Sequence, residues 1–235
     1  MATEIPSITL YSCHLCPFAQ RVRIALDLLE VPHEVKEVEL YPRGLRRMNK
    51  PAWYLEANPD GKVPSLKVGD KLLKESLNIV EYLLEAFGKN TKFDQPDPVK
   101  KAQARFFTYF FLDETMPAFY RALAGGEKLE PEWNLFLQRM KRVNQLLEEY
   151  SEEGPYFFGA HPTYADIACA PHMGRLFSAE VLYGKTIPRT SEFARVLAYK
   201  DTLAALPAFK KTMAPSDELL ELYDWMFVGG TSPRE

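Results

Sequence analysis

The sequence predicts a small α/β domain over residues 1–87, followed by an all-helical domain over residues 98–235. Up to residue 87, short alternating or valine-rich segments are interleaved with segments whose apolar residues recur at helical spacing. Beyond residue 97 the strand-like segments stop and helical spacing dominates. Residues 88–97 (GKNTKFDQPD) have the polar, turn-rich composition of a linker. A chain of 235 residues is long enough for two such domains.

The composition excludes several classes of protein. Hydrophobic residues make up 46% of the chain and charged residues 26%, as in folded proteins and unlike disordered ones. The 29 basic and 32 acidic side chains leave a net charge of -3, so we expect no nucleic-acid partner. Residues 1–10 lack the pattern of a secretory signal, and no apolar run approaches the ~18 residues that span a bilayer. We therefore expect a cytoplasmic protein without stable membrane insertion.

The elements of the first domain follow from local patterns. We expect, in chain order, a strand at 8–11, a helix at 17–31, a strand at 34–40, hairpin strands at 63–68 and 71–73, and a helix at 76–87. Gly69-Asp70 suits the two-residue turn of that hairpin. A helix between two strands implies a parallel pair, and the hairpin adds antiparallel strands, so the sheet should be mixed.

The second domain is marked by helix caps and prolines. Asp97-Pro98 suits an N-cap followed by proline at the first helical position. Thr163 with Asp166 forms a capping-box pattern, with Asp in place of Glu. We also expect helices at 131–150 and 217–227, a frayed tail at 229–235, and kinks or helix ends at Pro117, Pro171 and Pro207.

Cys16 is the strongest candidate for chemistry. It precedes Pro17, which suits the first position of a helix, so Cys16 should lie at the N-cap, facing free backbone N–H groups. Both the free N–H groups and the helix dipole favour thiolate, and we expect a pKa below the ~8.5 of a free cysteine. A thiolate there would be an activated nucleophile. The alternative is a small buried hydrophobic residue, as many free cysteines are.

The other two cysteines have different expected roles. Cys13 forms a CxxC with Cys16, a pattern of dithiol redox centres, and is either a resolving thiol or a loop residue. Cys169 lies in an apolar helical run and should pack in the core. Cys13, His14 and Cys16 lack a second ligand pair at zinc-site spacing, so we expect no metal.

Together these features resemble the cytosolic glutathione transferases. Cys16-Pro17-Phe18-Ala19-Gln20-Arg21 is similar to the Cys-Pro-Phe/Tyr motif of the omega and lambda classes. Further segments resemble family motifs: Lys50-Pro51-Ala52-Trp53-Tyr54, Asn58 to Pro64, Glu75 to Leu83, and the Thr163–Asp166 cap. The resemblance implies a thioredoxin-like N-terminal domain, an all-α C-terminal domain and a homodimer.

The resemblance also implies glutathione as co-substrate, and it implies the residues that bind it. These are Phe18 beside the thiol, Lys50 at the glycine end, the Val63 backbone before a cis Pro64, and Glu75 and Ser76 at the γ-glutamyl end. A helix N-terminus such as that at Ser76 is a physically sensible site for a carboxylate. Three of these residues also have a purely structural alternative: Ser76 as a helix cap, Lys50 as solvated surface, and Pro64 as a turn residue.

The implied activity is that of a glutathione-dependent thiol transferase or reductase, acting on a glutathionylated or small electrophilic substrate such as dehydroascorbate. Cys16 would form a mixed disulfide with glutathione. Two alternatives stay open. One is a glutathione-conjugating transferase that uses the hydroxyl of Tyr11 or Ser12, and the other is a non-catalytic protein like the chloride intracellular channel proteins, which share the architecture.

Two features depart from the omega pattern or extend it. The stretch Tyr41–Met48 lengthens the interval before Lys50, and Cys13 is not part of the omega motif. The pocket for the electrophile should lie between the domains. Its candidate aromatic residues are Phe106, Phe107, Tyr109, Phe110 and Trp225.

Overall fold

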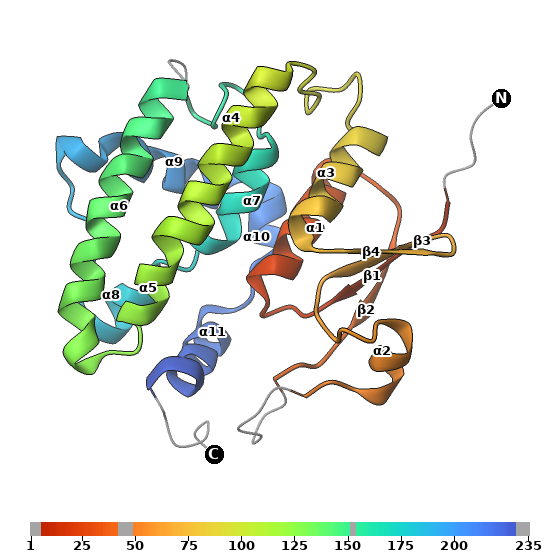
Figure 1. The fold of residues 1–235 in the computed structure, drawn as a ribbon, viewed down its shortest axis with the longest axis horizontal. Helices are drawn as coiled ribbons and strands as arrows, with labels where there is room; N and C mark the ends of the chain where they lie inside the picture. The colour runs from red at the N-terminus through yellow and green to blue at the C-terminus, as the bar shows by residue number, and fades with distance from the viewer. Residues whose placement is uncertain (1–5, 42–48, 151–153, 229–235) are drawn as a thin grey trace.

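The fold is seen in a computed structural model that describes residues 6–41, 49–150 and 154–228. A four-stranded sheet and a group of helices lie side by side (Figure 1). The strands are β1 (Ile8–Ser12), β2 (Glu34–Glu37), β3 (Ser65–Val68) and β4 (Lys71–Lys74). All four strands of the described sheet precede residue 75, so the mixed sheet belongs to the first part of the chain, as predicted.

The sheet has the order β2-β1-β3-β4. β1 pairs with β2 in parallel, while β3 runs antiparallel to both β1 and β4. Leu10 stands opposite Val35 on one side and Leu66 on the other. The parallel register places Ser12, the last residue of β1, opposite Glu37, the last residue of β2. Cys13 therefore leaves the sheet beside Glu37.

The helices of the first domain cover the sheet. They are α1 (Pro17–Leu28), α2 (Ala52–Ala57) and α3 (Ser76–Phe87). α1 and α3 pack together and lie between the sheet and α7, a helix of the second domain (Figure 1). α2 is held by Tyr54, a buried side chain whose ring packs against Tyr11. α1 ends three residues earlier than predicted, and β2 ends at Glu37 rather than Leu40.

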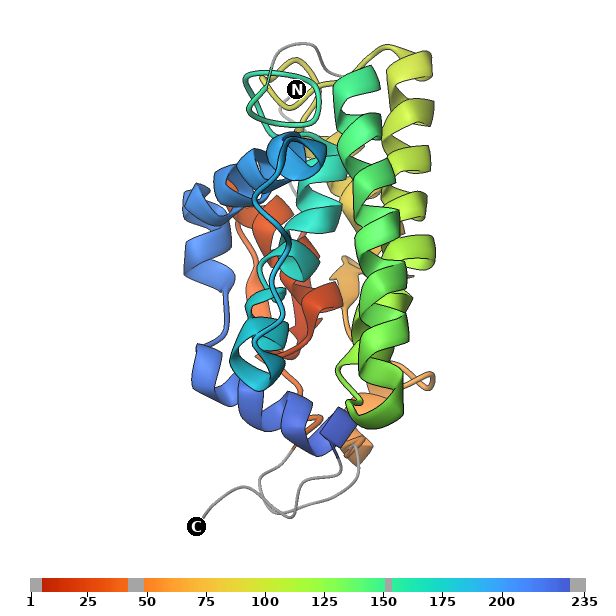
Figure 2. The ribbon, with the colours of Figure 1, turned by 90° about the vertical axis from the view of Figure 1, so that its left-hand side faces the viewer.

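In the described part of the second domain the regular elements are helices, apart from one isolated bridge between Tyr156 and Gly159. Its α-helices are α4 (Pro98–Tyr109), α5 (Met116–Ala122), α6 (Leu129–Tyr150), α7 (Tyr164–Met173), α8 (Phe177–Tyr183), α9 (Ala194–Ala205), α10 (Pro207–Thr212) and α11 (Ser216–Tyr223). Shorter 3-10 or π-helical turns cover 110–115, 126–128, 191–193 and 224–228. Figure 2 shows α10 and α11 descending along one side and then crossing the bottom of the molecule.

The predicted caps are present. The Asp97 side chain accepts from the Val99 N–H, and the Thr163–Asp166 capping box closes the start of α7. Pro207 begins α10, and Pro117 lies in the first turn of α5 after a π-helical segment, whereas Pro171 stays inside α7 near its end. The predicted tail at 229–235 and most of the Tyr41–Met48 stretch lie outside the described residues.

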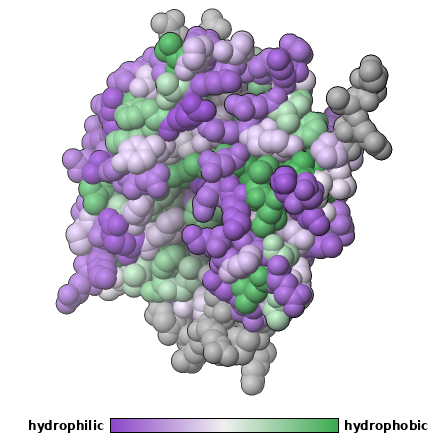
Figure 3. Space-filling model, turned by 45° about the vertical axis from the view of Figure 1, so that its right-hand side comes forward, coloured by the Kyte–Doolittle hydropathy of each residue, from purple (hydrophilic) through white to green (hydrophobic). Residues whose placement is uncertain are grey.

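The surface carries hydrophobic side chains in small patches separated by hydrophilic ones, as one face shows in Figure 3. The largest exposed apolar side chains come from several different elements: Phe18, Val35, Trp53, Val99, Phe106, Tyr109, Val181 and Met226. None of the helices in the described part of the chain is long and apolar enough to span a bilayer.

Candidate active site

Cys16 occupies the N-cap of α1, the position that the following proline predicted. Its backbone is extended, with φ -79° and ψ 120°, and its carbonyl accepts from the Gln20 N–H at 3.0 Å. Because Pro17 has no N–H, the first free donors of the helix are those of Phe18 and Ala19, and both stabilise the thiolate of Cys16. The Cys16 Sγ lies 3.9 Å from the Val63 carbonyl oxygen.

The expected lowering of the Cys16 pKa is not found. Only 7% of the residue is exposed, and burial raises the pKa of the thiol above its ordinary value. The N–H groups of Ala19 and Phe18 and the positive charges of Arg175 and Arg21 act in the opposite direction. The helix N-terminus is therefore present, but desolvation outweighs it in the ligand-free protein. Sequence spacing gives no measure of that burial.

One cavity of about 490 Å³ brings together seven residues expected to bind glutathione or react with it. They are Cys16, Phe18, Lys50, Val63, Pro64, Glu75 and Ser76. These residues come from four separate segments between the start of α1 and the start of α3. Leu40, Tyr41, Asn58, Asp60, Gly61, Lys62 and Lys74 complete the described lining. A pocket with a cysteine at one end and a serine at a helix start suits an extended, charged thiol peptide.

The Val63 edge of this cavity is held from behind by buried polar side chains. The Tyr54 hydroxyl donates to the Lys62 carbonyl at 2.6 Å, and the Asn58 amide donates to the same oxygen at 3.0 Å. The Val63–Pro64 peptide is cis, as the family resemblance implies. Within the described residues no group accepts from the Val63 N–H. That donor is therefore available to an extended ligand.

The start of α3 forms another part of the cavity lining. Glu75 is its N-cap and has φ +64°, a conformation that costs a non-glycine residue about 1–3 kcal/mol and that clusters at functional sites. The Ser76 Oγ accepts a hydrogen bond from Arg21 Nη1 at 3.0 Å. Because the guanidinium has only donors, the hydroxyl hydrogen of Ser76 stays free to donate to a carboxylate. Ser76 therefore does more than begin its helix.

The Lys50 side chain lies against Gly61, and both residues line the cavity. Its Nζ donates to the Asp60 carbonyl at 3.3 Å. Gly61 has φ +61°, and a Cβ at this position would lie 2.8 Å from the Lys50 Cδ. The neighbouring Asp60 carboxylate pairs with Lys74 at 2.7 Å, and this hydrogen bond lowers the Asp60 pKa. Lys50 is thus positioned by a glycine that tolerates both the backbone angle and the close contact.

A buried cationic cluster lies behind Cys16 and was not predicted. Arg21 is 2% exposed and donates to the Ala168 carbonyl at 2.9 Å and to His172 Nε2 at 2.8 Å. Arg175 is fully buried and donates to the Leu15 carbonyl, one residue before Cys16. Among the described residues, no carboxylate is hydrogen-bonded to either guanidinium. The two charges therefore act on the cysteine and the cavity without an acidic partner to neutralise them.

His172 is held neutral within this cluster. Burial and the charges of Arg21 and Arg175 lower its pKa well below the ordinary value. Since Arg21 can only donate, His172 Nε2 is the acceptor, and Nδ1 carries the proton that faces the Tyr120 hydroxyl at 2.8 Å. The ring also packs edge-on against Phe18 at 5.5 Å. A histidine and an arginine in the otherwise apolar run 167–177 were the available sequence signal.

The remaining candidates fall in different places. Cys13 is buried outside the described lining of the cavity, and desolvation raises the pKa of its thiol to about 11. Cys169 is fully buried, as expected for core packing. The two hydroxyl alternatives, Tyr11 and Ser12, are both buried, and the Ser12 Oγ accepts from Arg23 Nε at 2.7 Å.

The prediction of candidate aromatic residues for a pocket between the domains is partly wrong. Phe107 is fully buried and packs 4.6 Å from Phe157, so it belongs to the helical core. Phe106 and Tyr109 are exposed on α4, and Phe110 is half-buried. None of these side chains lines the described part of the cavity at Cys16. Trp225 is closer to it, because its ring lies 6.0 Å from that of Tyr41 in the cavity wall.

Known proteins share both halves of this chain. Family models for the N-terminal and C-terminal domains of glutathione S-transferase match residues 10–91 and 120–201. Glutathione S-transferase omega-1 of Mus musculus is 30% identical over 175 residues, which are 74% of this chain and 69% of that protein. Pyrimidodiazepine synthase of Drosophila melanogaster is 36% identical over 160 residues, which are 66% of this chain but only 59% of that protein.

A solved structure agrees with the sequence matches. Glutathione transferase Omega 1C from Trametes versicolor superposes with a TM-score of 0.77 at 29% identity, over 94% of this chain and 97% of that one. Both family domains are matched in order, and a cysteine begins the first helix as in the omega and lambda motif. The chain belongs to the glutathione S-transferase family, as an omega/lambda-like member.

Proposed function

We propose that the protein is a glutathione-dependent thiol transferase and reductase whose nucleophile is Cys16. The observation that carries the proposal is the cavity that joins Cys16 at a helix N-cap to the free Val63 N–H and the Ser76 hydroxyl. A cysteine at this position can form a disulfide with glutathione, whereas a hydroxyl can only stabilise the thiolate of glutathione for conjugation.

The binding mode follows from the chemistry of each end. The γ-glutamyl carboxylate would accept from Ser76 and from the N-terminal N–H groups of α3, and Glu75 would accept from the amine. The cysteinyl backbone of glutathione would pair with Val63, and Lys50 would meet the glycine carboxylate. Phe18, beside the thiol, is 48% exposed and covers Arg21, whose Cζ lies 4.9 Å from the centre of the ring.

The reaction has two exchange steps. The Cys16 thiolate attacks the glutathione sulfur of a mixed disulfide, a Cys16–glutathione disulfide forms, and the substrate leaves as a thiolate that takes a proton. A second glutathione thiolate then attacks the sulfur of the bound glutathione, which releases glutathione disulfide and regenerates Cys16. In the reduction of a dehydroascorbate-type electrophile, two glutathiones supply two electrons and two protons and become the disulfide. Cys13 is not required in either step.

Arg175 and Arg21 would support this chemistry electrostatically. Each exchange passes through species with negative charge on Cys16 sulfur, and both guanidinium groups favour that charge. Glutathione itself carries two carboxylates, so the same positive potential favours its binding.

Conjugation is the weaker candidate in this structure. Its candidate hydroxyl donors were Tyr11 and Ser12. Tyr11 packs against Tyr54 with ring centres 5.4 Å apart, and Ser12 is fully buried. The other alternative is a purely binding role, like that of the chloride intracellular channel proteins. In that case the cavity would hold glutathione, but Cys16 would not exchange disulfides with it.

The test is an assay of Cys16→Ser and Cys13→Ser with a glutathionylated peptide, and separately with an electrophile for conjugation. We expect Cys16→Ser to lose deglutathionylation by at least about 100-fold, while Cys13→Ser keeps it. Retained reductase activity in Cys16→Ser would overturn the proposal. Glutathione binding without exchange in the unmodified protein would support the binding role, and equal losses in both variants would make Cys13 a resolving thiol.

We infer a glutathione-binding domain over 1–87, a linker over 88–97 and a helical substrate-binding domain over 98–235. All three cysteines are free thiols, which fits a reducing cytoplasm. A homodimer, which the family resemblance implies, is tested by sedimentation equilibrium. The exposed Phe106 and Tyr109 on α4 offer apolar surface for such contact.

A further inference from the structure

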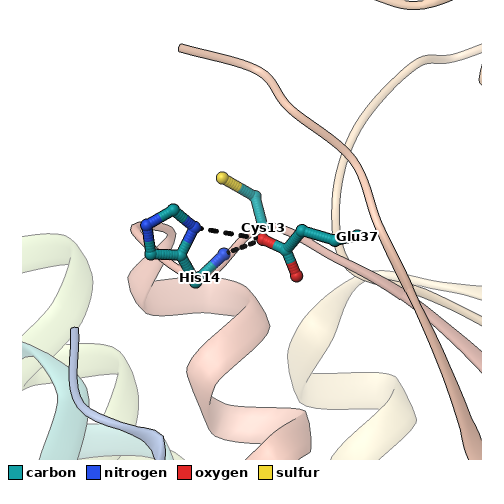
Figure 4. A group of neighbouring side chains, drawn as sticks. All are labelled: Cys13, His14 and Glu37. Atoms are coloured by element: carbon teal, nitrogen blue, oxygen red, sulfur yellow. Dashed lines mark hydrogen bonds and ion pairs between the residues drawn. The ribbon is translucent and has the colours of Figure 1, made fainter. Parts of the chain in front are cut away.

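Cys13, His14 and Glu37 form a cluster of three metal-ligating side chains outside the cavity at Cys16. The Cys13 Sγ, a His14 ring nitrogen and a Glu37 carboxylate oxygen all lie within 4.8 Å of one another. Figure 4 shows the three side chains converging where β1 runs into α1. We propose that this cluster is a binding site for a divalent zinc-like cation, with Cys13, His14 and Glu37 as its protein ligands.

The sheet creates this cluster, which is why sequence spacing did not predict it. Glu37 follows Cys13 by 24 positions, and the parallel register of β1 and β2 places it opposite Ser12. The Glu37 carboxylate thus becomes a third ligand beside Cys13 and His14, which follow β1. No CxxC-type pattern contains such a ligand. The prediction of no metal rests on spacing along the chain, and spacing does not bring Glu37 next to Cys13 and His14.

The spacing between the His14 and Glu37 ligand atoms suits a small tetrahedral cation. His14 Nδ1 and Glu37 Oε1 are 3.2 Å apart. Two ligands each about 2.0–2.2 Å from zinc at a tetrahedral angle are separated by roughly 3.3–3.5 Å, which is close to this spacing. The side chains of His14 and Glu37 are 45% and 44% exposed, so a cation can enter from solvent. Three protein ligands leave a fourth position open to water.

Each ligand is also held by an outer partner, as in established zinc sites. The other ring nitrogen of His14, Nε2, lies 2.7 Å from Glu218 Oε2 on α11, which orients the ring and fixes Nδ1 as the ligand. The other carboxylate oxygen of Glu37 accepts from Arg23 Nη2 at 2.5 Å. The backbone N–H groups of Leu15 and Leu40 face the Cys13 sulfur.

The charges balance when a cation is bound. The Cys13 thiolate and the Glu37 carboxylate supply two negative charges against the two positive charges of the metal, and the outer Arg23 and Glu218 cancel each other. A cysteine with no cation bound to it is mostly a thiol near neutral pH. Binding therefore displaces the Cys13 proton to solvent. A metal-bound Cys13 is withdrawn from disulfide chemistry, which leaves Cys16 as the single exchanging thiol.

The test titrates Co²⁺, as a spectroscopic probe for zinc, into the reduced, chelator-treated protein. We expect a thiolate-to-cobalt charge-transfer band, tetrahedral d–d bands, competition by Zn²⁺ and release of about one proton per ion from Cys13 at neutral pH. Cys13→Ser should abolish the thiolate band, whereas Cys16→Ser should keep it. A band that survives in Cys13→Ser, or that disappears only in Cys16→Ser, would overturn the site.

Variants of the carboxylates separate a metal site from an ordinary ion-pair network. Glu37→Gln removes a ligand and should weaken binding by at least about 100-fold, while Glu34→Gln, on the same strand, should leave it unchanged. Glu218→Gln alters an outer partner and should weaken binding by about 10-fold, against no change in Glu221→Gln. An octahedral cobalt spectrum without a thiolate band, or equal effects of Glu37→Gln and Glu34→Gln, would show that the cluster is only an ion-pair network.

Discussion

Arg21 Nη1 donates to Ser76 Oγ at 3.0 Å and thereby ties the helix that begins at Cys16 to the helix that begins at Ser76. The same guanidinium donates to the Ala168 carbonyl and to His172 of α7. One buried side chain of α1 thus connects the start of α3, in the cavity lining, to the helical domain. We therefore expect Arg21 to link the proposed glutathione site, the charge near Cys16 and the packing of the two domains.

Ser76→Ala tests the role of the hydroxyl in glutathione binding. A hydrogen bond to a charged group is worth about 1.5–3 kcal/mol, so the Kd for glutathione should rise about 10-fold to 100-fold. Isothermal titration calorimetry measures this directly. Ser191→Ala, at an exposed position of the helical domain, is the control and should not change the Kd. An unchanged Kd in Ser76→Ala would leave Ser76 as a helix-start residue only.

Gly61→Ala and Gly69→Ala form a matched pair that tests whether the packing of Lys50 over Gly61 affects glutathione binding. Both glycines have positive φ, +61° and +58°, so both substitutions should destabilise the fold by about 1–2 kcal/mol. At Gly61 the new Cβ would lie 2.8 Å from the Lys50 Cδ and 2.9 Å from the Leu55 Cδ2, whereas at Gly69 it would meet open space. We expect weaker glutathione binding in Gly61→Ala alone. Equal Kd values in both variants would show that Lys50 does not contact the ligand.

The low pKa of the buried His172 side chain predicts how the free energy of unfolding depends on pH. Its pKa is well below the ordinary value in the folded protein, so the unfolded chain binds a proton that the folded chain does not. The stabilising contribution is present above the unfolded pKa of ~6.5 and is lost as pH falls below it, by up to about 1.4 kcal/mol per pH unit. Urea unfolding at pH 7, 6 and 5 should show this slope, and His172→Gln should reduce it. The same slope in both proteins would contradict a buried neutral His172.

Cys16 should react slowly at neutral pH and faster as pH rises. Burial raises the pKa of its thiol, so the alkylation rate with iodoacetamide, measured with a chelator present, should still be increasing above pH 8. Arg175→Gln removes a nearby positive charge and should shift the curve to higher pH, while Arg189→Gln, on the exposed 184–190 segment, should not. A rate that levels off below pH 7 would mean that the helix N-terminus outweighs burial.

The residues that sequence predicted correctly are those whose role is local. Proline after Cys16 determines a helix start, and the Thr163–Asp166 pattern determines a capping box, because only neighbouring residues take part. Ser76 was likewise predicted at the first position of its helix. In each case the signal and the structure lie within a few positions of one another.

The residues that sequence missed depend on packing between distant segments. Arg21 lies off the apolar stripe of its helix but is buried, because α7 covers that face as well. Arg175 reaches the Cys16 loop across the domain contact, and Glu37 reaches Cys13 through strand register. Phe107 was one of several candidates for the pocket but faces the core, since helical spacing alone does not say which of several aromatic residues points inward.

The central claim is that Cys16 exchanges disulfides with glutathione. The most direct measurement is mass spectrometry of the protein after rapid mixing with a glutathionylated peptide, followed by addition of reduced glutathione. The account predicts one glutathionyl adduct, located at Cys16 and absent from Cys169, that forms and is then removed at the rate of turnover. An adduct found only at Cys13, or turnover with no adduct at Cys16, would contradict it.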